Sequence, residues 1–144
     1  MKIQSVYTVP SVYFNQLMRF IMSVDRLSIG ALKKILAGKV KEDATCVIKF
    51  YSNDCHLCHN LKEYYEDISN TKSYNDIHFF AFNIDNYPAI EKQLSFNGVP
   101  TISLIKTYSS AQKPKIRVLQ DPPDPQENTW YRVRDIKDFI EEEK

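Results

Sequence analysis

The sequence predicts an α/β fold in which helices cover both faces of a central mixed β-sheet, with an N-terminal extension before it. From residue 28 onward, short strand-like runs alternate with amphipathic helical segments, as in parallel βαβ units. Two further strand-like runs and a last helical segment follow, and they indicate an antiparallel hairpin at one side of the sheet. The chain has 144 residues, of which 43% are hydrophobic, enough for one buried core.

The first half of the domain begins with a helix that Ser28 can cap and that Gly38 ends. Residues 44–51 form a β-rich run with the length of a buried strand. Asn53 and Asp54 then supply a turn and a cap for the next helix. The apolar positions of that helix, spaced to share one face, are Leu57, Leu61, Tyr64, Tyr65 and Ile68.

The second half predicts a strand at 77–84 and then a short helix that Asp85 or Asn86 caps, with Pro88 in its first turn. Strands at 101–106 and 115–119 should pair in antiparallel fashion, and 133–143 should form the last helix. The proline-rich stretch 121–128 can only be a loop. Residues 1–27 fit either a helix or a strand, so the domain is assigned to 28–144 and 1–27 to the extension.

Composition excludes several classes of function. The net charge of +1 argues against a nucleic-acid partner, and the small cluster Lys33, Lys34, Lys39 and Lys41 is interpreted as a solvated helix face. No apolar run reaches the roughly 18 residues of a membrane span, and the N-terminus makes a poor signal peptide. We therefore expect a monomer that is not bound to a membrane and lies in a reducing, cytoplasmic compartment.

Two of the three cysteines form the motif Cys55-His56-Leu57-Cys58. In a reducing compartment such a motif is either redox-active or half of a zinc site. It lies where a predicted strand ends and a helix begins, and the unpaired N–H groups of a helix N-terminus favour a thiolate. Cys55 would attack a substrate disulfide, and Cys58, one turn later, would resolve the mixed disulfide.

A zinc site is the competing interpretation of the same segment. His59 extends the motif to Cys-His-Leu-Cys-His, but a closed zinc site needs further ligands and no second such motif exists. We expect neither a metal nor another cofactor. Cys46 lies among apolar residues in a predicted strand and should be an inert core thiol.

Three stretches carry a resemblance to a known family. They are residues 47–58, which include the motif, residues 82–85, and residues 98–105, which include Val99-Pro100. In these stretches the chain resembles the thioredoxin superfamily, including the catalytic domains of protein disulfide isomerases. The resemblance implies the thioredoxin fold, protein disulfides as substrates and a thiol or reductase as electron donor. It also implies that Cys55 attacks, that Cys58 resolves, that Pro100 follows a cis bond, and that the Val99 backbone binds the substrate strand.

Three positions near the motif depart from the family pattern and should tune its redox chemistry. Asp54 replaces an aromatic residue, and its carboxylate would disfavour the thiolate unless it is solvated. A protonated His56 beside the attacking thiol would stabilise the thiolate, whereas a solvent-facing His56 would have little effect. Lys49 stands where the family usually has a buried acid. If buried, its pKa should fall and its neutral amine could accept the Cys58 proton; otherwise the ammonium reaches water and takes no part.

Two functions of different class follow from the sequence. The first is a thiol–disulfide oxidoreductase of the reductase or isomerase type, working through Cys55 and Cys58. The second is a non-catalytic module that binds a protein partner through the groove around Cys55 and Val99-Pro100. The proline-rich loop 121–128 favours the second, because the corresponding family loop is usually short.

Overall fold

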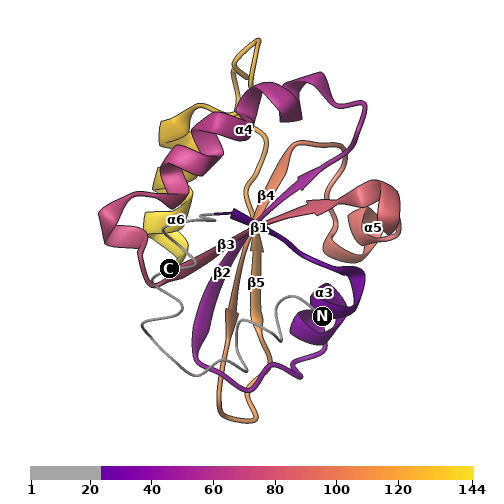
Figure 1. Ribbon diagram of the computed structural model, residues 1–144, viewed down its shortest axis with the longest axis vertical. Coiled ribbons are helices and arrows are strands. Elements are labelled where there is room, and N and C mark those ends of the chain that lie inside the picture. The colour runs from indigo at the N-terminus through magenta and orange to yellow at the C-terminus, as the bar shows by residue number, and fades with distance from the viewer. Residues whose placement is uncertain (1–23) are drawn as a thin grey trace.

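The computed structural model, which describes residues 24–144, contains the mixed sheet predicted from the sequence, with one further strand, Val24–Arg26, from the segment assigned to the extension (Figure 1). The five strands of the sheet are β1 (Val24–Arg26), β2 (Ala44–Tyr51), β3 (Ile77–Asn83), β4 (Thr101–Thr107) and β5 (Lys115–Val118). Their order in the sheet is β1-β3-β2-β4-β5, with β1 and β2 parallel to β3, β4 antiparallel to β2, and β5 antiparallel to β4. The expectations for residues 1–23 lie outside the described residues.

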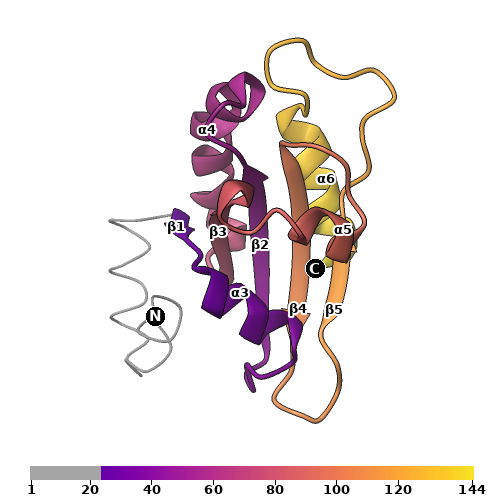
Figure 2. The same ribbon diagram turned by 90° about the vertical axis from the view of Figure 1, so that its right-hand side faces the viewer.

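Helices cover both faces of this sheet, which confirms the predicted fold class (Figures 1 and 2). The α-helices are α3 (Ile29–Leu36), α4 (His56–Ser69), α5 (Ile90–Leu94) and α6 (Val133–Glu143), and the 3₁₀ turns are η1 (Lys72–Tyr74) and η2 (Ile84–Asn86). Helices α4 and α6 pack on one face, and α3 and α5 pack on the other. The antiparallel β4–β5 hairpin lies at one side of the sheet, also as predicted.

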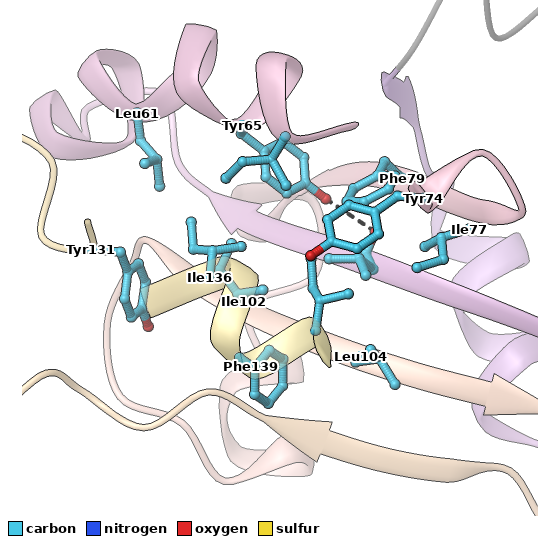
Figure 3. Close-up of a cluster of buried hydrophobic side chains, with 13 residues drawn as sticks. Leu61, Tyr65, Tyr74, Ile77, Phe79, Ile102, Leu104, Tyr131, Ile136 and Phe139 are labelled. Carbon is cyan, nitrogen blue, oxygen red and sulfur yellow. Dashed lines mark hydrogen bonds between the residues drawn. The ribbon is translucent and has the colours of Figure 1, made fainter. Parts of the chain in front are cut away.

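Strand β2 lies in the middle of the sheet and separates the two cores, because its side chains alternate between the faces. Val47 packs in the core under α4 and α6, whereas Cys46, Ile48 and Phe50 pack in the core under α3 and α5. Figure 3 shows the first core, to which α4 contributes Tyr65, the sheet contributes Phe79, and α6 contributes Ile136 and Phe139. The alternation places Lys49 on the same face as Val47, beneath α4.

The helix starts show where sequence reasoning succeeds and where it fails. Ser28 caps α3 as predicted, because its hydroxyl accepts the Ala31 N–H at 3.1 Å. The prediction that Asn53 and Asp54 cap the next helix is wrong, since the N-cap of α4 is Cys55. The predicted helix after residue 85 is also wrong in detail, because the chain first forms the turn η2 and α5 begins only at Ile90.

The apolar face predicted for α4 holds only in part. Leu61, Tyr65 and Ile68 are buried, but the side chain of Tyr64 is 50% exposed. Tyr64 and Tyr65 point about 100° apart around the helix axis, and of these two only Tyr65 faces the core. The buried face of α4 is therefore narrower than the sequence pattern suggested.

Candidate redox site

The two motif cysteines lie at the junction of β2 and α4 and form a disulfide. Strand β2 ends at Tyr51, a short turn follows, and α4 begins at His56, so Cys55 is the last residue before the helix. Cys58 lies one turn later, and the Cα atoms of the pair are 5.2 Å apart. The junction brings together the strand end, the helix start and the two sulfurs, as the sequence predicted.

The start of α4 is arranged around the sulfur of Cys55. The N–H of Cys58 donates to Cys55 Sγ at 3.0 Å, and the N–H of His59 donates to the Cys55 carbonyl at 3.1 Å. A side chain at an N-cap takes up one of the N–H groups that a helix leaves unpaired, and the macrodipole adds positive potential there. When the disulfide is reduced, this position favours the thiolate of Cys55 over its thiol.

The two sulfurs differ in their access to solvent. Cys55 is half-buried at the surface, whereas Cys58 is only 3% exposed. A substrate can therefore reach Cys55 but not Cys58 in this arrangement. The geometry suits Cys55 as the attacking residue and Cys58 as the one that attacks afterwards from within.

Val99 and Pro100 lie beside the disulfide, although they are far from it in the sequence. Cys55 Sγ is 3.6 Å from the carbonyl oxygen of Val99, and the Val99–Pro100 peptide bond is cis. Val99 and Pro100 belong to the loop between α5 and β4, which two hydrogen bonds hold in place. The Gly98 N–H donates to Glu91 Oε2 at 2.7 Å, and the Thr101 hydroxyl donates to the Gly98 carbonyl at 2.7 Å. The loop thus presents the backbone of Val99 next to the Cys55 sulfur.

A hydrogen-bond network that the sequence did not reveal fixes the turn before Cys55. The Asn53 N–H donates to Asp85 Oδ2 at 3.1 Å, and the Asn83 amide donates to Asn53 Oδ1 at 2.9 Å. Asn83 also accepts the Asp85 N–H and so caps η2. These contacts join residues about thirty positions apart, which no local pattern can show. Asp54 and His56, on either side of Cys55, are both exposed.

Lys49 is buried beneath α4, and only 5% of the residue is exposed to solvent. It lines a cavity of about 450 Å³ that Cys55 and Cys58 also line. Burial lowers the pKa of Lys49 from 10.5 to about 8; the nearby Glu66 carboxylate opposes this shift, and the Lys62 ammonium adds to it. The structure therefore brings Lys49 to the dithiol, whereas it leaves Asp54 and His56 in solvent.

The loop between β5 and α6 lies at the end of the sheet where α4 begins (Figures 1 and 2). The Asn60 side chain of α4 donates to the Asn128 carbonyl of this loop at 2.9 Å. The Trp130 indole N–H donates to Asp121 Oδ1 at 3.1 Å, and Trp130 itself has a φ of 67°. A left-handed conformation is unusual for so large a residue, so the loop closes on a strained position next to α6.

No group of three or more His, Cys, Asp or Glu side chains is placed to hold a metal ion among residues 24–144. Within the same range, no helix is both long and apolar enough to cross a membrane.

The sequence matches the thioredoxin family profile over residues 32–118, which is more than half of the chain. No curated protein sequence matches it. Solved structures share the fold at low identity. A thioredoxin from Malassezia sympodialis is 18% identical with a TM-score of 0.56, and the match covers 83% of this chain and 88% of that one. The Trx4 domain of ERdj5 is 14% identical with a TM-score of 0.60, covering 83% and 92%. A Plasmodium falciparum thioredoxin is 17% identical with a TM-score of 0.55, covering 81% and 84%.

Proposed function

The chain belongs to the thioredoxin family, and we propose that it is a thiol–disulfide oxidoreductase that reduces or exchanges disulfide bonds of proteins through Cys55 and Cys58. The observation that carries the proposal is the position of Cys55 Sγ, which accepts the Cys58 N–H at the start of α4 and lies beside the Val99 carbonyl. A helix N-terminus lowers the pKa of a thiol and so supplies a nucleophile near neutral pH.

The reaction proceeds in two exchange steps. The Cys55 thiolate attacks one sulfur of the substrate disulfide, and the other substrate sulfur leaves as a thiolate and takes up a proton. Cys58 then loses its proton and attacks Cys55 Sγ, which breaks the mixed disulfide and releases the second substrate thiol. The substrate gains two electrons and two protons, and Cys55 and Cys58 are left as the disulfide. A thiol or a reductase restores the dithiol by the reverse exchange.

Val99 and Pro100 bind the substrate in this proposal. The Val99 carbonyl faces Cys55 Sγ, so an extended substrate segment that pairs with the Val99 backbone brings its own sulfur close to Cys55. Asp54 and His56 tune the reaction only weakly, because both side chains are exposed and solvent screens their charges.

Insulin reduction driven by dithiothreitol tests the proposal. We expect the unaltered chain to accelerate insulin precipitation, and Cys55→Ser and Cys58→Ser to remove the acceleration. Cys46→Ala is the matched control, since it removes the buried third cysteine and leaves the dithiol intact. Equal rates for the unaltered chain and Cys55→Ser would exclude the enzyme.

A second candidate is a module that binds a protein partner through the same groove without turnover. The loop between β5 and α6 favours this second candidate. The Asn60 side chain of α4 donates a hydrogen bond to this loop, and the loop enlarges the protein surface at the end of the sheet where α4 begins. In that case Cys55→Ser should leave partner binding unchanged. Partner capture that is equal for Cys55→Ser and the unaltered chain, together with no insulin reduction, would establish the module and exclude the enzyme.

A further inference from the structure

Lys49 is the one charged residue whose side chain is buried among residues 24–144. It lies on β2, the central strand, where its neighbours in register are Ala81 on β3 and Ile102 on β4. Burying an ammonium in such a place costs several kcal/mol unless other groups compensate for the lost water. A buried charge that costs this much free energy indicates that Lys49 has a role in the chemistry of the site.

The surroundings of the Lys49 ammonium compensate for its burial only in part. Its Nζ lies 5.2 Å from the ring centroid of Tyr65 and 5.9 Å from that of Tyr51, close enough for weak cation–π attraction. No salt bridge of Lys49 forms within the described part of the chain. The ammonium thus lies near aromatic faces and has no carboxylate at contact distance. Its proton is therefore easier to remove than the proton of a lysine in water or in a salt bridge.

The cavity connects Lys49 to the disulfide and to the surface. It is lined by both cysteines and has room for water that could bridge them to Nζ. The other titratable or charged groups that line it come from β1, β2 and α4, and they are Asp25, Arg26, Tyr51, His59, Lys62, Tyr65 and Glu66. Among these, Glu66 favours the charged form of Lys49 and Lys62 disfavours it.

We propose that Lys49 is the proton acceptor of the resolving step, and that in the reduced chain, before this step, its ammonium form stabilises the thiolate of the dithiol. This inference rests on the proposed function. The neutral amine takes the Cys58 proton through the cavity, the Cys58 thiolate attacks Cys55 Sγ, and the departing substrate thiolate takes up a proton that the ammonium can return. No oxidant or reductant beyond the substrate disulfide and the dithiol takes part.

The pKa of Lys49 fits this role, since a value of about 8 leaves part of the amine neutral near physiological pH. The charge has a second consequence for the equilibrium. A thiolate is negative and a disulfide is neutral, so the ammonium stabilises the reduced form alone. Lys49 should therefore make the Cys55–Cys58 couple more oxidising, and its removal should favour the disulfide.

The test compares Lys49→Met with Lys62→Met. Methionine keeps the apolar stem without the amine, and Lys62 is a second lysine of the same cavity that is exposed and screened by solvent. The probes are glutathione, for the equilibrium constant between dithiol and disulfide, and Ellman's reagent, whose second released thiolate reports the resolving attack of Cys58.

We expect Lys49→Met to shift the glutathione equilibrium about tenfold toward the disulfide, or about 30 mV for a two-electron couple. We also expect it to slow the second release from Ellman's reagent by at least about tenfold near pH 7 and to change its pH profile. Lys62→Met should change the glutathione equilibrium constant and the rate of the second release by less than about threefold each. Values for Lys49→Met that equal those of Lys62→Met would overturn the inference.

A further readout separates this inference from the proposed function. The rate of alkylation of Cys55 by iodoacetamide, followed against pH, reports the thiolate directly and needs no turnover. If insulin is not reduced but Lys49→Met still raises the pKa of the thiol, the proposed function fails and the electrostatic role of Lys49 stands. If insulin is reduced and neither the thiol pKa nor the resolving rate depends on Lys49, the role of Lys49 fails alone.

Discussion

The N–H of Cys58 donates to the sulfur of Cys55 across 3.0 Å, so the residue that caps α4 is also one half of the disulfide. Sulfur replaces the oxygen that usually caps a helix. Reduction of the disulfide would leave the Cys55 sulfur in front of the unpaired N–H groups of α4, where negative charge is favoured. The fold of the helix start and the reactivity of the thiol thus depend on the same contact.

Tyr65→Phe should lower the free energy of unfolding by about 1–3 kcal/mol. Tyr65 belongs to the core of Figure 3, and its hydroxyl lies 2.7 Å from the Phe80 carbonyl and 3.1 Å from the Val47 carbonyl. Removal of the hydroxyl leaves buried carbonyl groups without this donor. Urea unfolding measures the effect. Tyr64→Phe is the control, since its side chain is half exposed and should change stability by less than about 0.5 kcal/mol.

Asn83→Ala should destabilise the turn that precedes Cys55. The Asn83 side chain donates to Asn53 and accepts the Asp85 N–H, and loss of such a cap costs about 0.5–2 kcal/mol. We expect faster hydrogen exchange in residues 52–56 and slower insulin reduction. Asn97→Ala, at an exposed loop position, serves as the comparison. Exchange in 52–56 that is the same in both variants would show that this network does not hold the turn.

Lys49→Met should stabilise the oxidised chain at neutral pH by up to about 3 kcal/mol, since the pKa of Lys49 falls from 10.5 to about 8 on folding. Below pH 8, Lys49 is charged in both folded and unfolded states, and the full cost of its burial applies. Between pH 8 and 10.5 the unfolded chain binds more protons at this site, so the cost shrinks as pH rises. The gain in stability of Lys49→Met, measured by urea unfolding, should therefore fall across that range. A gain that is constant from pH 7 to above pH 10 would contradict the shift.

Asn60→Ala should release the loop between β5 and α6 from α4, because the Asn60 amide donates to the Asn128 carbonyl. Limited proteolysis within residues 121–129 should become several times faster, with little change in global stability because the contact is exposed. Asn75→Ala, at an exposed site after η1, provides the baseline. Equal cleavage rates in the two variants would mean that other contacts hold the loop.

Strong periodicity made most of the fold predictable. Strand β2 and helix α6 have the bounds expected from the sequence, because a continuous apolar run and a clear amphipathic pattern leave few alternatives. The sequence also predicts the cysteine pair at a strand–helix junction, and the family resemblance implies that Val99–Pro100 lies beside it; the structure has both features.

Features set by distant contacts were not predictable. Asn and Asp are common N-caps, so the sequence predicts a cap at Asn53 and Asp54. In the structure the Asn53 N–H instead donates to Asp85, and Cys55 is the N-cap of α4. The burial of Lys49 depends on how α4 lies over β2, and alternation along the strand could give its face but not its exposure.

Trapping of the mixed disulfide tests the central claim most directly. In Cys58→Ser the resolving step is absent, so the adduct of Cys55 with a disulfide substrate should accumulate and be found by mass spectrometry. In Cys55→Ser no comparable adduct should form, because Cys58 is only 3% exposed. Adducts that form equally in both variants, or in neither, would contradict the role of Cys55 as the attacking thiol.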